Sequence, residues 1–168
     1  LFNKLNKLGI CVLESIAIIL KQPKDFFTDK VEKGNSILRL IHYPPVEGSS
    51  NLLRARAHAD INLITLLVGA EEAGLEVQSK DNNWIPVSAN SNAIVCNIGD
   101  MMQLITDGHL KSTPHRVIEY NKGKSKSRFS MPFFLHPAPG VVLKSIFRDD
   151  DEGAVSYTHL RAHETEEN

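Results

Sequence analysis

The segment His58-Ala59-Asp60 places an imidazole and a carboxylate two residues apart, just ahead of an apolar run. In extended backbone, residues i and i+2 point to the same face, so both side chains reach into one space. Two histidines and one carboxylate form a facial ligand set that leaves open positions on iron(II). His115 precedes the apolar segment Arg116-Val117-Ile118 and is the best candidate for the second histidine. These three residues predict a metal site with room for further ligands.

A second group of polar residues could bind the carboxylate of an organic acid. Arg128 and Ser130 flank Phe129, so a guanidinium and a hydroxyl share one face of an expected strand. Arginine binds carboxylates through two parallel hydrogen bonds, and the serine hydroxyl can add a third. Tyr43, on an earlier expected strand, offers a phenolic hydroxyl to the same carboxylate. The pattern predicts a carboxylate-binding subsite.

Two helices and a series of short strands must position these side chains. Apolar residues recur at helical spacing over residues 1–20, and a shorter helix is expected from Asp25 to Lys33. Strands are expected at residues 37–41, 61–68, 75–78, 84–87, 93–98, 102–106, 116–120, 128–135 and 141–143. Many short strands behind two helices predict a mainly β protein, a double-stranded β-helix (jelly roll) with N-terminal flanking helices.

The chain divides into three segments of different character. Residues 1–35 are expected to form the flanking helices, and residues 36–147 the jelly-roll domain. Residues 148–168 begin with an acidic run and then lack both periodicity and core-forming residues, so a disordered or non-native tail is expected there. The chain starts with Leu1, without a leader-like segment, and reads as a piece of a longer protein.

Composition narrows the class of function. A net charge of -1 gives no electrostatic footprint for nucleic acid, and Lys7, Glu14 and Lys21 interrupt the longest apolar stretch, so no membrane span is expected. Cys11 and Cys96 cannot build a disulfide framework, and two reduced thiols favour a cytoplasmic location. Composition thus favours neither a nucleic-acid partner nor a membrane partner. Its oligomeric state cannot be read from the sequence.

The order Tyr43-Pro44, His58-x-Asp60, His115-Arg116-Val117 and Arg128-x-Ser130 resembles the iron(II)/2-oxoglutarate-dependent dioxygenases, in their isopenicillin N synthase-like branch. The resemblance runs from about residue 38 to residue 137. Strand signatures similar to those of the family support it: residues 74–77, 84–87, 97–100 and 133–135. Four spaced motifs in the same order make the resemblance specific.

The resemblance implies a role for each of these residues. His58, Asp60 and His115 match the catalytic iron ligands. Arg128 and Ser130 match the pair that binds the distal carboxylate of 2-oxoglutarate, with assistance from Tyr43 at the cofactor-binding position. The implied activity is oxidative decarboxylation of 2-oxoglutarate coupled to hydroxylation or desaturation of a small organic substrate. Fe(II), 2-oxoglutarate and dioxygen are the implied cofactors and cosubstrates, with ascorbate as a further candidate.

A count of charges is consistent with this assignment. Iron(II), Asp60, 2-oxoglutarate and Arg128 together sum to zero, so a buried site can close without an uncompensated charge. The chain departs from the family pattern at Ile41 and His42, where the family often has asparagine and tyrosine, so contacts from these two positions are not carried over. The family also has a sizeable N-terminal region that covers the barrel and shapes the substrate pocket, and no counterpart of it is expected among the residues of this chain.

Two alternatives remain at this point. One is an iron oxidase of the same branch that does not use 2-oxoglutarate, in which Arg128 and Ser130 grip a carboxylate of the substrate instead. The other is a non-catalytic metal-binding jelly roll, or an inactive fragment that binds iron but does not position a substrate. Release of succinate would separate the first alternative from the dioxygenase.

Overall fold

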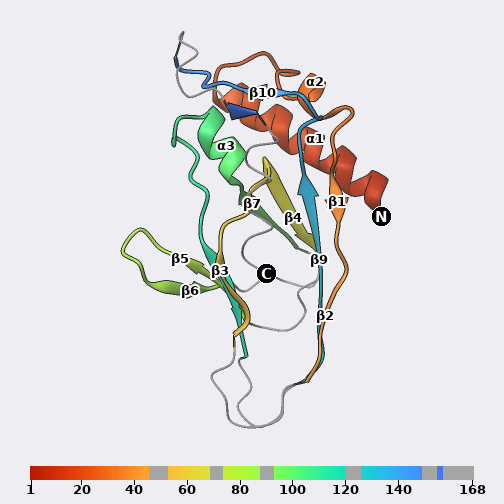
Figure 1. The fold of residues 1–168 in the computed structure, drawn as a ribbon, viewed down its shortest axis with the longest axis vertical. Helices are drawn as coiled ribbons and strands as arrows, with labels where there is room; N and C mark the ends of the chain where they lie inside the picture. The colour runs from red at the N-terminus through yellow and green to blue at the C-terminus, as the bar shows by residue number, and fades with distance from the viewer. Residues whose placement is uncertain (46–52, 69–73, 88–92, 120–125, 149–154, 157–168) are drawn as a thin grey trace.

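The computed structural model describes residues 1–45, 53–68, 74–87, 93–119, 126–148 and 155–156, and two antiparallel sheets form its centre (Figure 1). The larger sheet joins β1 (Ile37–Leu38), β2 (Ile41–Tyr43), β9 (Arg128–Leu135), β4 (Ile64–Val68) and β7 (Ile94–Ile98). The smaller sheet joins β3 (Leu53–His58), β8 (His115–Ile118), β5 (Leu75–Gln78) and β6 (Trp84–Pro86). The expected mainly β fold with N-terminal helices is confirmed.

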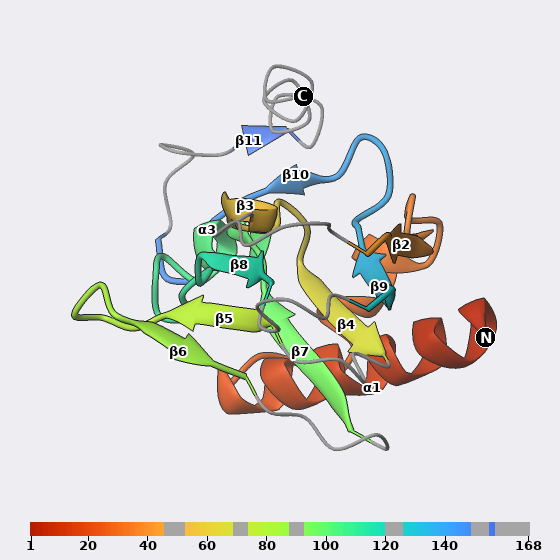
Figure 2. The same cartoon turned by 90° about the horizontal axis from the view of Figure 1, so that it is seen from below.

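The helix α1 (Phe2–Ile19) lies across the larger sheet and covers its outer face (Figure 2). Its buried residues recur every four positions, at Leu5, Gly9, Leu13 and Ala17, and so form one apolar stripe. Gly9 allows a close approach, because a Cβ atom there would lie 3.2 Å from Cδ2 of Leu135. The main hydrophobic core is therefore the layer between α1 and this sheet, rather than the space between the two sheets.

Side chains of β9 alternate between that core and the space between the sheets. Phe133 and Leu135 are fully buried and belong to the core beside α1. Residues of the opposite parity, among them Arg128 and Ser130, face the interior between the sheets. Because the side-chain period of a strand is two, one strand supplies apolar residues to the core and polar residues to the interior.

Two sequence predictions are corrected by the structure. Residues 102–106 do not form a strand, because α3 (Asp100–Ile105) occupies that position with Met101, Met102 and Ile105 in the core. A short apolar run buried on several sides carries no periodicity that separates strand from helix. The second N-terminal helix, α2 (Thr28–Val31), is a single turn and shorter than expected.

One strand was missed, and the end of the chain is only partly described. β3 contains three charged or polar side chains, Arg54, Arg56 and His58, and so lacks the apolar run by which the other strands were recognised. Near the C-terminus, β10 (Val142–Leu143) pairs with β11 (Val155–Ser156), which falls in the expected tail. Residues 149–154 and 157–168 of that tail lie outside the described residues. The three-segment division of the chain stays a prediction.

Two further observations concern the whole described part of the chain. None of its helices is long and apolar enough to cross a membrane. Cys11 and Cys96 are both free thiols.

The start of α3 packs against the loop between β3 and β4. Backbone N–H groups of Asp100 and Met101 donate to the carbonyl oxygens of Asp60 and Ile61, at 2.7 and 3.0 Å. These donors have no acceptor within their own helix, so the loop satisfies them and is held in place by them. Gly99 makes this approach possible, because a Cβ atom there would lie 2.0 Å from the carbonyl oxygen of Asn62.

We predict that Gly99→Ala destabilises the fold through this contact. The added methyl would collide with backbone rather than with a flexible side chain, so the free energy of unfolding should fall by about 3 kcal/mol in urea titrations. Gly140→Ala is the control: a Cβ atom there meets nothing within 4 Å, although φ is +84°. Its cost should be about 1 kcal/mol, from backbone strain alone. Equal losses in the two variants would contradict the close-packing role of Gly99.

Candidate metal and carboxylate site

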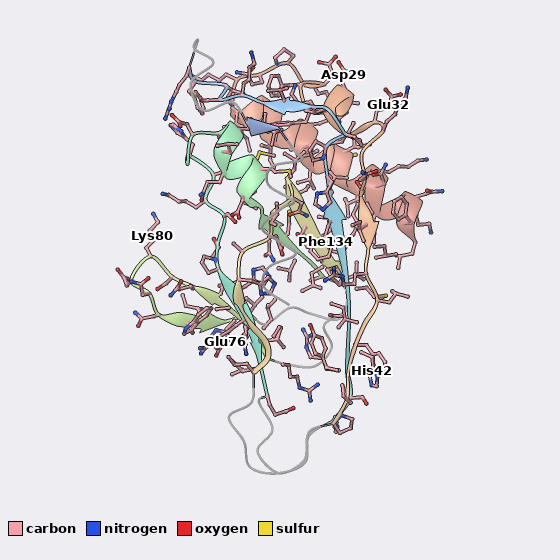
Figure 3. The ribbon with its side chains drawn as sticks, viewed as in Figure 1. Asp29, Glu32, His42, Glu76, Lys80 and Phe134 are labelled. Carbon is pink, nitrogen blue, oxygen red and sulfur yellow. The ribbon has the colours of Figure 1, made fainter. Side chains whose placement is uncertain are left out.

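A cavity of about 1110 Å³ opens between the two sheets. Its wall includes all six side chains that the sequence singled out: Tyr43, His58, Asp60, His115, Arg128 and Ser130. These side chains come from both sheets and from the loop that packs against α3, so segments far apart in the chain form the wall of the cavity. The structure thus brings the predicted metal ligands and the predicted carboxylate-binding residues to one cavity. Figure 3 shows side chains from both sheets directed into this interior.

His58, Asp60 and His115 converge at one end of the cavity. Among the described residues they are the one group of histidine, cysteine and acidic side chains that could hold a metal ion, with potential ligand atoms within 4.8 Å of one another. The imidazole rings of His58 and His115 are 4.4 Å apart between centroids, and Nε2 of His115 lies 3.7 Å from Oδ1 of Asp60. These separations suit three donors around a single ion.

The two imidazoles are oriented by backbone carbonyl groups. Nδ1 of His58 lies 2.8 Å from the carbonyl oxygen of Arg56, and Nδ1 of His115 lies 3.3 Å from that of Thr113. A carbonyl oxygen only accepts, so each Nδ1 carries the proton in these bonds and each Nε2 is left with a lone pair. Metal-binding histidines are held in this manner. Both rings therefore present an acceptor nitrogen to the cavity.

The direction of the His58 side chain is set by the irregular pairing of β3 with β8, and not by the regular alternation of side chains along a strand. Ala55 pairs with Val117 and His58 pairs with His115, so three residues of β3 span the interval that two residues of β8 span. This bulge re-aims the end of β3 and places the two histidines directly opposite each other. Asp60 lies beyond the end of the strand, in the loop held by α3, and not on a strand beside His58. The expected shared face of His58 and Asp60 thus arises from a bulge and a loop.

Two buried polar residues that the sequence analysis missed hold the carboxylate of Asp60. Thr65 donates its hydroxyl proton to Oδ2 of Asp60 at 2.7 Å, and Nδ2 of Asn62 donates to Oγ1 of Thr65 at 3.0 Å. Asn62 and Thr65 are 1% and 2% exposed, so these bonds are shielded from water. The chain of donors occupies Oδ2 and leaves Oδ1 directed toward His115. In the sequence, only the spacing Asp60-x-Asn62-x-x-Thr65 could have indicated this chain of hydrogen bonds.

Arg128, Ser130 and Tyr43 form a second polar group in the cavity. Arg128 and Ser130 are 2% and 4% exposed, at the start of β9. Tyr43 pairs with Arg128 across the strands, and the guanidinium carbon lies 5.2 Å from the centre of the tyrosine ring. A buried guanidinium beside a hydroxyl and a phenol is suited to a carboxylate, because the positive charge is little screened there.

His42 does not add to the site. His42 is exposed on the other face of β2, where it stacks on Phe129 at 4.6 Å between ring centroids. Of the two adjacent phenylalanines on β9, Phe133 belongs to the core and Phe134 lines the cavity. The cavity therefore contains a donor set that fits a divalent transition metal, a carboxylate-binding group, and apolar wall residues.

Comparison with known proteins agrees with this geometry. The sequence profile of the 2OG-Fe(II) oxygenase superfamily matches residues 34–137. A 2-oxoglutarate-dependent dioxygenase of Didymella fabae is 36% identical over 140 residues, which cover 80% of this chain and 42% of that protein. The 2-oxoglutarate-dependent dioxygenase citB of Monascus ruber is 39% identical over 140 residues, with the same coverage. The chain thus spans less than half the length of these relatives.

Solved structures give the same result. A 2OG-Fe(II) oxygenase family protein from Caulobacter crescentus superposes with a TM-score of 0.88 at 40% identity, covering 99% of this chain and 57% of that one. A full-length Neurospora crassa protein, solved in complex with alpha-KG, superposes with a TM-score of 0.87 at 27% identity, covering 97% of this chain and 54% of that one. The shared part is therefore the part that carries the cavity.

We predict that Thr65→Val weakens metal binding while the fold is kept. Valine preserves the shape of threonine but cannot donate to Asp60, and loss of such a supporting bond typically lowers metal affinity about 10-fold to 100-fold. Affinity for Zn(II) or Co(II) can be measured by competition with a chelator. Thr106→Val is the matched control, since Thr106 is similarly buried and donates to the carbonyl oxygen of Met102 at the C-terminal end of α3. Equal affinities of the two variants would contradict the role of Thr65.

Proposed function

Because the chain belongs to the 2OG-Fe(II) oxygenase superfamily, we propose that it couples the oxidative decarboxylation of 2-oxoglutarate to the oxidation of a small organic substrate. The observation that supports the proposal most directly is the placement of two groups in one cavity. Three potential metal ligands stand within 4.8 Å of one another, and Arg128 with Ser130 provides a buried carboxylate grip. A chelating keto acid needs both groups at once.

His58, Asp60 and His115 would hold the iron(II) through two imidazole nitrogens and one carboxylate oxygen. Iron(II) chelated by 2-oxoglutarate supplies activation of dioxygen for attack on a C–H bond of the substrate. The donor set fits this ion, because two imidazoles and one carboxylate leave positions for a bidentate cosubstrate and for dioxygen. The Nδ1 bonds of both histidines and the Thr65 bond of Asp60 keep the ligands in place before the metal arrives.

Arg128 and Ser130 would bind the distal carboxylate of 2-oxoglutarate, and Tyr43 would donate to the same group. The guanidinium is already buried, so little further desolvation is needed when the anion enters. Cosubstrate held at both ends is oriented as well as bound, which lowers the entropic barrier of the reaction. Arg128 also balances the charge of the ternary site, which sums to zero with iron(II), Asp60 and 2-oxoglutarate.

The partner that this cavity fits is a small molecule, oxidised by hydroxylation or desaturation. The related Neurospora crassa protein was also solved with alpha-KG and thymine, which is a small molecule of this kind. Ascorbate is proposed as an auxiliary reductant for the iron. Two free thiols support a reducing, cytoplasmic location. Residues 36–147, which carry every residue of the cavity wall, are proposed as the catalytic domain.

Formation of succinate tests this proposal. Purified chain supplied with Fe(II), 2-oxoglutarate, ascorbate and dioxygen should release succinate slowly without substrate, and faster when a substrate is present. His58→Ala removes one of three ligands and should lower the rate by at least about 100-fold. His42→Ala is the control, since that imidazole is exposed and faces away from the cavity.

The alternatives give different results in the same assay. Consumption of dioxygen without succinate would contradict the proposal and favour an oxidase that does not use 2-oxoglutarate. Binding of iron with neither dioxygen consumption nor succinate would also contradict it, in favour of a non-catalytic metal-binding domain. Equal rates in His58→Ala and the unaltered chain would overturn the assignment of the ligands.

A further inference from the structure

One cationic side chain on the cavity wall is not used by the proposed function. Along β1, β2 and the two residues that join them, every second residue lines the cavity: Ile37, Arg39, Ile41 and Tyr43. They lie opposite the inward residues of β9, since Ile37 pairs with Phe134 and Tyr43 pairs with Arg128. Arg39 continues this register, because its backbone N–H donates to the carbonyl oxygen of Pro132 at 3.0 Å. Arg39 therefore lies four residues before Tyr43, on the same side of the extended backbone.

The guanidinium of Arg39 is accessible and stands over an aromatic ring. Its carbon lies 5.6 Å from the centre of the Phe134 ring, which holds the side chain toward the cavity. Arg39 is exposed, and among the described residues its guanidinium has neither an ion-pair partner nor a side-chain hydrogen bond. Its donors are thus available to a ligand.

Phe134 connects Arg39 to the metal end of the cavity. Thr65 is the cross-strand partner of Phe134, and Thr65 donates to the carboxylate of Asp60 at 2.7 Å. A molecule anchored at Arg39 and lying on the Phe134 ring would therefore rest beside the proposed iron ligands. Arg128 lies at the other end of the same strand, six residues from Phe134. The guanidinium groups of Arg39 and Arg128 therefore lie in different parts of the cavity.

The charge of the cavity also favours an anion at this second position. Among the described residues, three arginines line it, Arg39, Arg56 and Arg128, against two aspartates, Asp60 and Asp100. Iron(II) and 2-oxoglutarate carry equal and opposite charges, so their binding leaves the positive excess unchanged. Positive potential in a cavity of low dielectric draws in anions. Arg56 belongs to β3, so it reinforces this potential from the smaller sheet.

The described wall residues next to Arg39 on the larger sheet are apolar. Ile37, Ile41, Leu67, Pro132 and Phe134 line the cavity from the larger sheet. Such a surface binds a hydrocarbon or aromatic body through burial of apolar area and does not bind a second charged group. A ligand that fits both features has one anionic end and one apolar end.

We propose that Arg39 and Phe134 form the recognition site for a substrate that carries a carboxylate on an apolar body. The inference rests on the proposed function, because it uses the iron position as the reacting centre. The carboxylate pairs with the Arg39 guanidinium at the rim of the cavity, and the apolar body lies on the Phe134 ring beside the metal ligands. Arg39 is thus a specificity-determining residue, and neutral analogues of the same shape are poor ligands.

Matched pairs of probes test this site. The probes are 3-phenylpropionate, 4-phenylbutyrate and 5-phenylvalerate, each compared with its neutral primary amide by calorimetry. Zn(II) and saturating 2-oxoglutarate are present throughout, so that the grip at Arg128 is filled and no turnover occurs. At least one acid should bind about 10-fold more tightly than its amide, the difference expected for one charge-assisted bond.

Variants locate that preference. Arg39→Gln should reduce the ratio between acid and amide to below about threefold, and Arg39→Lys should retain part of it, because the positive charge remains although the paired geometry of the guanidinium is lost. Lys80→Gln is the control, since Lys80 is exposed in the turn between β5 and β6 and lies far from Phe134 (Figure 3). Its ratio should match that of the unaltered chain.

Outcomes for the two proposals are distinguishable. Binding of Zn(II) and 2-oxoglutarate is measured first in the same calorimeter, and its failure contradicts the proposed function. The acid and amide comparison on the metal-free chain then still tests Arg39. With both bound, no acid preference in any pair, or the same preference in Arg39→Gln, overturns the inference about Arg39 alone.

Discussion

The alternation of side chains along β9, and along β4 beside it, is the constraint on which the rest of the structure depends. Each strand turns one row of residues to α1 and the other row to the cavity. Leu66 and Phe133 are nearly or fully buried on the outer row, while Thr65 and Ser130 stand on the inner row. A slip of one residue would exchange the rows and lose both the core and the site. Packing of α1 therefore fixes the register of the functional residues.

The apolar layer lies outside the barrel, and this leaves the space between the sheets for polar chemistry. Arg128 and Asp60 are both buried there, which is costly unless each charge has a partner. The hydrogen bond from Thr65 to Asp60, and the contact of Arg128 with Tyr43, provide part of the compensation within the chain. A metal ion and a dicarboxylate would add charges opposite to those of Asp60 and Arg128. The site thus contains buried charges that bound ligands of opposite charge would compensate, and the surrounding fold holds these side chains in position.

Much of this arrangement could be predicted from the sequence, because its main signals are local. The i, i+2 spacing of Arg128 and Ser130 corresponds directly to one face of a regular strand, and β9 begins and ends where expected. The set His58, Asp60 and His115 was also named from spacing, although its geometry comes from the β3 bulge and from a loop. The spacing in the sequence could identify these three residues, but it could not predict the bulge and the loop that orient their side chains.

Other features could not be predicted, since they depend on distant contacts. α3 was expected as a strand because its apolar residues are buried without a clear period, and its contact with the Asp60 loop joins residues far apart in the chain. β3 could not be recognised as a strand because it contains three polar side chains, Arg54, Arg56 and His58. Asn62 and Thr65 carry no motif of their own, and the role of Arg39 follows only from its register with Pro132. In each case tertiary structure, not local preference, decides the outcome.

An anaerobic absorption titration tests the central claim most directly: that one cavity holds iron(II) and 2-oxoglutarate together. The chain is loaded with Fe(II), and 2-oxoglutarate is then added while the visible charge-transfer band of the chelate is followed. The account predicts that the band appears at saturation, and that Arg128→Leu requires a much higher concentration of 2-oxoglutarate although its affinity for Fe(II) is unchanged. Bound iron without the band, or an equal loss of both affinities in Arg128→Leu, would contradict it.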